Sequence, residues 1–208
     1  MRESCVGLPL ERFVYASSSS IYGDNASIPM REEARPQPVS PYGVTKLAAE
    51  QLCYLYHVNH GVPTTSLRYF TVYGPRQRPD MAFHRFIRAA LGGDPITLFG
   101  DGEQTRDFTF VKDAVAATAA AGERGVPGRA YNIGGGSRVS INEVLEMIGR
   151  VAGRPLTIRR EPEQKGDMRD TFADTGLARR DLGFAPAVSL EDGIEAEYRW
   201  LSTTPALR

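Results

Sequence analysis

A tyrosine and a lysine four positions apart carry the clearest chemical signal in this sequence. Tyr42 and Lys46 follow Ser40-Pro41, which is typical of a helix start with serine at the N-cap and proline at N1. On a helix, side chains at i and i+4 share one face, so we expect Lys46 beside Tyr42. A phenol normally has a pKa of about 10, and a neighbouring ammonium favours the phenolate. The pair therefore indicates a base that takes a proton from a hydroxyl group.

A serine cluster upstream follows an apolar run. Residues 12–17 have the two-sided apolar character of a strand buried on both faces of a parallel sheet, and the serines 17–20 stand at its end. Open sheets of this class bind ligands at the carboxyl ends of their strands. Separately, these features also fit a polar loop and a solvated helix face. Together they predict a substrate clamp.

The elements that position these groups alternate between strand and helix. Strand 12–17, helix 41–60 closed by Gly61, and strand 64–70 predict one right-handed crossover unit of a parallel sheet. Ser140 and Glu143 have the spacing of a capping box. Further helices are expected near 80–91, 112–123, 141–151, 175–182 and 190–201, and further strands at 96–99, 107–111, 130–133 and 156–160.

Composition narrows the function classes. The 208 residues hold 25 basic and 25 acidic side chains, which gives no electrostatic case for a nucleic-acid or membrane partner. Two cysteines and three histidines make a zinc site improbable, so no metal is expected. No apolar run approaches the roughly 18 residues of a membrane span, and the N-terminus has no hydrophobic signal core. These features predict a soluble, cytoplasmic protein.

Six motifs occur in an order that resembles a known family. The chain is similar to the extended short-chain dehydrogenases/reductases, in their nucleotide-sugar epimerase/dehydratase branch. The resemblance covers essentially the whole chain. It implies an α/β fold: the C-terminal part of a Rossmann-like parallel sheet plus a smaller α/β substrate-binding domain. The motifs are YASSSSIYG (15–23), SPYGVTK (40–46), RYFTVYGP (68–75), GDGEQTRDF (100–108), YNIG (131–134) and KGD (165–167).

The resemblance assigns roles by position. Tyr42 matches the family's catalytic base, and Lys46 matches the lysine that holds the nicotinamide ribose. Ser18 matches the residue that hydrogen-bonds the reacting C4 hydroxyl. NAD is implied as cofactor and a nucleotide-sugar as substrate. The residues expected at NAD are Ser17, Tyr42, Lys46, Tyr69 and Phe70. The residues expected at the nucleotide-sugar are Ser18, Ser19, Thr71, Arg78, Arg106 and Asp167, with Arg106 on the diphosphate and Asp167 near the ribose.

Neighbouring positions favour one reaction and one sugar. Ser19 and Ser20 stand where 4,6-dehydratases have acidic residues, and the glutamate of the related decarboxylases is absent, which leaves 4-epimerisation through a 4-keto intermediate. Thr71 and Gln164 look more like UDP-glucuronate 4-epimerases than UDP-galactose 4-epimerases. In that case Thr71 and Arg78 would hold the sugar's carboxylate and restrain loss of CO₂ from a β-keto acid. UDP-glucose or UDP-galactose is the next choice.

The family's opening strand, glycine-rich turn and helix have no counterpart in this sequence. Gly134-Gly135-Gly136 follows a strand but lies too late and lacks the spacing. At roughly 30 residues per crossover unit, about 100 residues are expected to be absent. We therefore expect an exposed strand edge, poor NAD binding and weak or no activity alone. The homodimer interface usual in the family, which uses the Tyr42 helix, should be compromised.

Residues 1–75 and 111–153 are expected to form the remainder of the NAD-binding domain, and 76–110 and 154–208 the nucleotide-sugar-binding domain. Two alternatives stay open. One is a non-catalytic protein that retains only the nucleotide-sugar pocket, which the intact Ser18, Tyr42 and Lys46 argue against. The other is a dehydratase or decarboxylase of the same branch.

Overall fold

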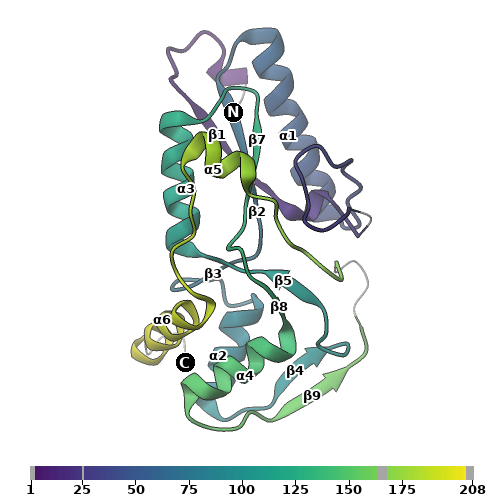
Figure 1. Cartoon of the computed structure of the whole chain (residues 1–208), viewed down its shortest axis with the longest axis vertical. Helices are drawn as coiled ribbons and strands as arrows, with labels where there is room; N and C mark the ends of the chain where they lie inside the picture. Colours follow the sequence, from purple (N-terminus) through teal and green to yellow (C-terminus); the bar gives the residue numbers. More distant parts are fainter. Residues whose placement is uncertain (1–2, 25, 164–167, 205–208) are drawn as a thin grey trace.

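The molecule is built from two lobes stacked along its long axis (Figure 1). The computed structural model describes residues 3–24, 26–163 and 168–204. The sheet lobe, at the top of the view, holds a three-stranded parallel sheet in the order β1-β2-β7. The pocket lobe, below it, holds a three-helix layer and short paired strands. The α/β fold expected from the sequence is confirmed.

The sheet lobe contains the predicted crossover unit. Strands β1 (Phe13–Ser18) and β2 (Thr64–Tyr69) run parallel and are joined through helix α1 (Pro41–His60). Ser40 caps α1 by accepting the Gly43 N–H, and Gly61 ends it in the left-handed conformation. Strand β7 (Ala130–Ile133) pairs with the other edge of β2. The local start and stop signals of α1 therefore gave its bounds correctly.

Helices cover both faces of this sheet. On one face, Glu50 of α1 lies against Arg68 of β2. On the other, Leu67 packs in a buried cluster with helices α3 (Val111–Arg124) and α5 (Gly176–Leu182). Five residues of β2 are buried, as expected for a central strand. β1 has the exposed edge that we expected: its first four residues are partly or fully exposed, because only β2 pairs with it among the described strands.

The pocket lobe packs around a second core. Helices α2 (Ala82–Gly92), α4 (Ile141–Ala152) and α6 (Leu190–Thr203) pack together, and the predicted capping box of Ser140 and Glu143 opens α4. β4 (Ile96–Phe99) pairs parallel with β9 (Ile158–Glu161). The remaining short elements are η1 (Glu3–Cys5), η2 (Ser19–Ile21), β3 (Val72–Tyr73), β5 (Thr105–Asp107), β6 (Thr109–Phe110) and β8 (Arg138–Ser140).

Two helices pack differently from the predicted division of the chain. α4 falls within the expected NAD-binding part but packs on α2 and α6 in the pocket lobe. α5 falls within the expected substrate part but packs on α3 and β7 in the sheet lobe. The apolar residues of each helix show that one of its faces is buried, but they do not show which element covers that face. The lobe that each helix joins is therefore set by tertiary packing.

One segment ties the lobes together. Residues 168–174, which we name the strap, form backbone bonds with both. The Met30 N–H donates to Phe172 O at 2.7 Å in the sheet lobe, and Thr105 N–H donates to Arg169 O at 3.1 Å in the pocket lobe.

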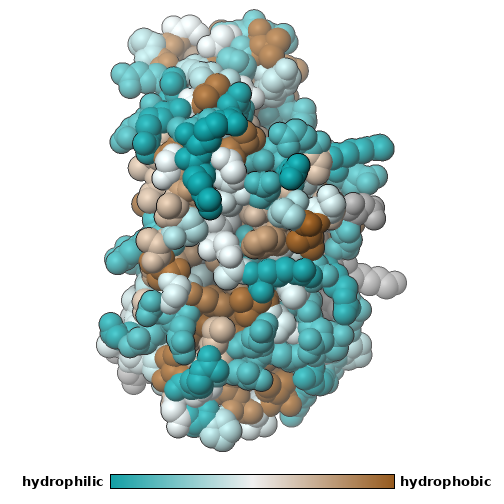
Figure 2. Space-filling view, in the orientation of Figure 1, coloured by the Kyte–Doolittle hydropathy of each residue, from teal (hydrophilic) through white to brown (hydrophobic). Residues whose placement is uncertain are grey.

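Figure 2 shows polar side chains over most of one face, with smaller apolar groups between them. No helix in the described part of the chain is long and apolar enough to cross a membrane.

Candidate active site

The three catalytic candidates gather at the carboxyl end of β1. Ser18 is the last residue of that strand, and Lys46 Nζ donates to the Ala16 carbonyl at 2.9 Å. The same Nζ lies 5.6 Å from the centre of the Tyr42 ring, so the expected Tyr/Lys juxtaposition is present. Tyr42 is 54% exposed, which leaves its hydroxyl open to a ligand. The arrangement suits proton transfer at this edge of the sheet.

A glycine lets α1 approach the serine loop closely. A Cβ at Gly43 would lie 2.4 Å from the Ser20 carbonyl oxygen, so only glycine fits the first turn of α1 here. Ser18 Oγ accepts the Ser20 N–H at 3.1 Å and caps η2. Ser18 and Ser19 are both buried, at 7% and 8% exposed. The serine cluster is therefore a rigid edge beside Tyr42 rather than a solvated loop.

A buried network of charges lies behind the site. Ser17 Oγ donates to Glu50 Oε2 at 2.6 Å, and Arg68 Nη2 donates to Glu50 Oε1 at 2.6 Å. Burial lowers the pKa of Arg68, but its bonds to Glu50 outweigh this effect and the pKa is raised overall. Arg68 also donates to the Tyr22 hydroxyl, which donates to Asn132, and burial raises the pKa of Tyr22 to about 12. The network joins β1, β2, β7 and α1 at the site's edge.

The five predicted cofactor contacts differ in which of their groups a ligand could reach. Tyr42 and Lys46 point a hydroxyl and an ammonium to the surface of the site. The Ser17 hydroxyl is committed to Glu50, and Phe70 is fully buried, so a ligand contact from either residue would use the backbone. The Tyr69 hydroxyl lies 2.6 Å from Thr118 Oγ1 on α3, and burial raises its pKa.

A cavity of about 590 Å³ opens in the pocket lobe, next to this edge. β2 ends at Tyr69, which is in register with Ser18, and Thr71 lies in the cavity wall two residues later. The cavity thus begins where the catalytic candidates end. Three guanidinium groups and three aromatic rings line it, from Arg85, Arg106, Arg169, Phe86, Phe99 and Phe108, together with the carboxyl groups of Asp80, Asp101 and Glu163.

The strap holds one of these arginines and supplies another. Arg106 Nη1 donates to Arg169 O at 2.9 Å, and the Arg169 side chain lies 3.5 Å from Asp101. Cations beside aromatic and apolar walls suit an anionic nucleotide, because phosphate oxygens need N–H donors and a base needs a flat apolar surface. Arg106 was expected here from the sequence, but Arg85 and Arg169 were not.

Arg78, a further substrate candidate, is not part of this wall. Arg78 is exposed and pairs with Asp80 at 3.4 Å, so binding a sugar carboxylate would require it to leave that partner. Asp167 and Gln164 lie outside the described residues. The structure thus brings Thr71 and Arg106 together, groups Ser18 with Tyr42 and Lys46, and leaves Arg78 on the rim.

A buried aspartate that sequence reasoning missed supports the cavity. Asp107, next to Arg106, accepts the N–H groups of Gly136 and Ala173, each at 3.0 Å. Burial raises its pKa to about 6, although these N–H bonds act in the opposite direction. A Cβ at Gly134 would lie 2.4 Å from its carboxyl oxygen. The glycine run after β7 therefore wraps a carboxylate, which explains why its spacing suits no dinucleotide turn.

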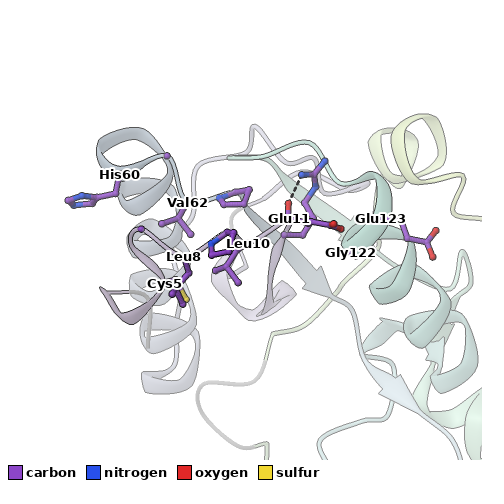
Figure 3. A pocket seen from close by; sticks show the side chains of 13 residues that line it. Cys5, Leu8, Leu10, Glu11, His60, Val62, Gly122 and Glu123 are labelled. Carbon is purple, nitrogen blue, oxygen red and sulfur yellow. Dashed lines mark hydrogen bonds between the residues drawn. The ribbon is translucent and has the colours of Figure 1, made fainter.

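A second hollow, of about 560 Å³, lies at the opposite end of the sheet (Figure 3). Leu10 and Glu11 precede β1 in its wall, Val62 precedes β2, and Arg12 donates to the Glu11 carbonyl. It is far from the carboxyl ends of the strands, so we do not assign it to the site. In residues 3–24, 26–163 and 168–204, no group of three or more His, Cys, Asp or Glu is placed to hold a metal ion.

Comparison with known sequences decides the family. A family model described as the NAD dependent epimerase/dehydratase family matches residues 1–134. The chain belongs to this family. Its members are enzymes, and the resemblance expected from the six motifs is confirmed. The cofactor of this family is NAD, so the hydrogen-bond donors of the site are compared below with what NAD requires.

Individual relatives narrow the comparison. The uncharacterized UDP-glucose epimerase YtcB of Bacillus subtilis is 44% identical over 97% of this chain and 64% of that protein. A UDP-glucuronate 4-epimerase of Thermodesulfobacterium geofontis is 38% identical over 92% of this chain and 59% of that protein. The structure of UDP-glucuronic acid 4-epimerase from Bacillus cereus, in complex with UDP-glucuronic acid and NAD, matches with a TM-score of 0.94 and 45% identity, over 97% of this chain and 64% of that one. The chain therefore spans about two thirds, or slightly less, of these proteins.

Proposed function

We propose that this chain carries the catalytic tyrosine and the nucleotide-sugar pocket of an NAD-dependent UDP-sugar 4-epimerase. UDP-glucuronate is the favoured substrate, and UDP-glucose or UDP-galactose comes next. The observation that carries the proposal is the meeting of two groups at one sheet edge. Tyr42, Lys46 and Ser18 lie at the end of β1, and the arginine-lined cavity begins at Thr71.

The donor set around Tyr42 suits the nicotinamide end of NAD. An ammonium has three N–H donors, and Lys46 uses one on the Ala16 carbonyl, so two remain for ribose hydroxyls. Bound NAD⁺ would supply a reversible hydride acceptor. Tyr42 would take the proton from the C4 hydroxyl and return it after the 4-keto sugar has turned over. Ser18 would hold the same oxygen, and Lys46 would favour the phenolate of Tyr42.

The guanidinium groups of the cavity support an acidic sugar nucleotide, whereas the net charge of its lining does not, since Asp80, Asp101 and Glu163 are there too. Arg106, with Arg169 and Arg85 in the same cavity, would bind the diphosphate. Thr71 in the wall and Arg78 on the rim would bind a carboxylate at the sugar's C6. Holding that carboxylate in a fixed orientation would restrain decarboxylation of the 4-keto intermediate. The T. geofontis and B. cereus relatives named as UDP-glucuronate epimerases support this choice of sugar.

The first test removes one hydroxyl. The chain is incubated with NAD⁺ and UDP-glucuronate, and the C4 epimer is followed by NMR, with slow turnover expected because the chain spans only part of its relatives' length. Tyr42→Phe should slow the reaction by about 100-fold or more, since general-base catalysis contributes on this scale. Tyr54→Phe is the matched control, because Tyr54 is also exposed on α1, at 56%.

Other outcomes would change the proposal. Released CO₂ or a 4-keto-6-deoxy product would contradict epimerisation, and turnover of UDP-glucose without UDP-glucuronate would contradict the sugar. UDP-glucuronate binding measured by calorimetry, without turnover in any variant, would favour the non-catalytic binding protein.

We also propose that a second copy covers the outer side of α1. Apolar side chains stand exposed there at helical spacing, among them Leu52, Leu55 and Val58, which are between 42% and 60% exposed. Because the interface is expected to be compromised, sedimentation equilibrium should show a dimer only at high concentration, and Val58→Glu should convert this dimer to a monomer. A wild-type monomer at all concentrations would contradict the proposal.

A further inference from the structure

A glutamate on the last helix is buried in the apolar core of the pocket lobe. Glu197 of α6 is 0% exposed. Its Oε2 accepts the Gly74 N–H at 2.8 Å, and its Oε1 has no hydrogen-bond partner in the described part of the chain. A buried carboxyl with one bond and no cation is costly, so its retention here needs a physical reason.

The Gly74 N–H belongs to a turn that runs between two pocket-lining segments. We name residues 74–78 the Gly74 turn. It follows Thr71 and β3, carries Arg78, and leads to Asp80, so both of its ends reach the cavity wall. The turn is strained at Arg76, which has φ of 72°, whereas Gly74 adopts φ of 131° without strain because it has no Cβ.

One backbone bond and two side chains, those of Gln77 and Glu197, hold this turn. Gln77 donates its N–H to Gly74 O at 3.0 Å and its side-chain N–H to Val72 O at 3.0 Å. A Cβ at Gly74 would lie 2.8 Å from Val111 Cγ1, so the turn is pressed against the start of α3. Glu197 accepts the Gly74 N–H of the turn in the buried core. Without an acceptor there, that N–H would be buried and unpaired.

We propose that Glu197 is a positioning residue: it holds the Gly74 turn so that Thr71 and Arg78 select a sugar that carries a carboxylate. This inference rests on the proposed function for its ligand, and on the Glu197–Gly74 contact for its mechanism. Glu197 itself touches no substrate. It acts through the backbone of the turn, by its contact with the Gly74 N–H.

Titration gives the contact a second signature. Burial raises the pKa of Glu197 to about 8, although the Gly74 N–H acts in the opposite direction. Glu197 shares one neighbour, Tyr73 on β3, with Asp113 on α3 and Asp192 on α6. Burial raises the pKa of Tyr73, and the charges of these three carboxylates raise it further. The His84 ring of α2 makes an edge contact with the Trp200 ring of α6, with 6.2 Å between the ring centroids. Burial therefore favours the protonated form of Glu197 at neutral pH.

The experiment uses three variants of the full 208-residue chain. Glu197→Gln keeps an oxygen that can accept the Gly74 N–H, whereas Glu197→Leu removes it. Glu195→Leu is the matched control, because Glu195 is an exposed residue of the same helix that pairs with Arg199. Binding of UDP-glucuronate and of UDP-glucose is measured by calorimetry at pH 7. Hydrogen exchange at Gly74 is measured without ligand.

We expect Glu197→Leu to weaken UDP-glucuronate binding about tenfold and UDP-glucose binding less than about twofold. A tenfold change in affinity is on the scale of the free energy of one hydrogen bond. Glu197→Gln should bind both like wild type, and Glu195→Leu should change neither. Gly74 should exchange about tenfold faster in Glu197→Leu alone. Equal weakening of both nucleotides would show a merely structural role and overturn the inference.

The ligand-free readouts separate this inference from the proposed function. If wild type binds neither nucleotide, the proposed function fails and so does the selectivity, whatever the exchange shows. If both nucleotides bind and Gly74 exchanges equally in all variants, the positioning contact is wrong while the proposed function stands. Because the folded pKa is raised, wild-type stability should fall as pH rises from about 4.5 to about 8, and Glu197→Gln should lack this loss. Identical pH curves would also overturn the contact.

Discussion

Two glutamates are buried almost completely, one in each lobe, and their surroundings differ. Glu50 in the sheet lobe receives N–H groups from Arg68 and a hydroxyl from Ser17. Glu197 in the pocket lobe receives a single backbone N–H. The first carboxylate has its charge balanced by a guanidinium at 2.6 Å. The second has none, and burial raises its pKa to about 8.

The difference separates two ways of using a buried acid. In the sheet lobe, an ion pair fixes three strands and the Tyr42 helix in one arrangement, and its geometry is satisfied at nearly every polar atom. In the pocket lobe, a carboxyl that is neutral near pH 7 holds one turn by one bond. We infer that the sheet lobe is built for rigidity, whereas the turn beside the cavity is held by a contact that pH can change.

The strongest way to break the comparison is to remove the cation from the sheet lobe. Arg68→Met would leave Glu50 buried with only the Ser17 hydroxyl. We expect a loss of about 3–5 kcal/mol in the free energy of unfolding, because a buried charge would lose its partner. Urea unfolding measures the loss.

Two controls accompany that variant. The double variant Glu50→Met with Arg68→Met should lose clearly less, since no charge is left buried alone. Arg150→Met removes an exposed pair with Glu191 at 3.5 Å and should change stability by about 0–1 kcal/mol. If Arg68→Met were no worse than Arg150→Met, the sheet lobe would not depend on the ion pair.

Asp107 offers an intermediate case that sharpens the comparison. It is fully buried and has no cation, but it accepts backbone N–H groups from the strap and from the glycine run. Burial raises its pKa from 3.8 to about 6. Its contribution to stability is therefore complete below pH 3.8 and is lost as pH rises through 6.

Asp107→Asn should remove this pH dependence. Between pH 4 and pH 7, wild type should lose about 2 kcal/mol more stability than the variant, since each unit of pKa corresponds to about 1.4 kcal/mol. The free energy of unfolding is measured in urea at several pH values. Parallel curves for the two proteins would mean that the N–H bonds compensate fully for burial.

Features with local causes could be predicted from the sequence. The cap at Ser40, the left-handed Gly61 and the capping box at Ser140 each depend on residues within one turn, and all three are present. The i,i+4 pairing of Tyr42 with Lys46 follows from helix geometry in the same way.

Features that depend on distant partners could not be predicted. The paired strands β3 with β6 and β5 with β8 have only two or three residues each, too few for a periodic pattern. Glu50 and Arg68 are 18 positions apart, and Asp107 meets Ala173 across 66. Arg169 enters the cavity only because the strap returns to it. Nothing local in the sequence distinguishes these residues from surface charges.

The strap also fixes the order in which this molecule can be completed. Asp24 and Met30 meet their partners Arg169 and Phe172 across more than 140 positions of sequence. Synthesis at about 5–20 residues per second would separate the two halves of these contacts by roughly 7–30 seconds. During that interval Asp24 and Met30 have no strap to pair with, and contacts between residues so far apart in the sequence also form slowly. The part of the cavity wall that Met168 and Arg169 form is therefore completed only after these residues have emerged.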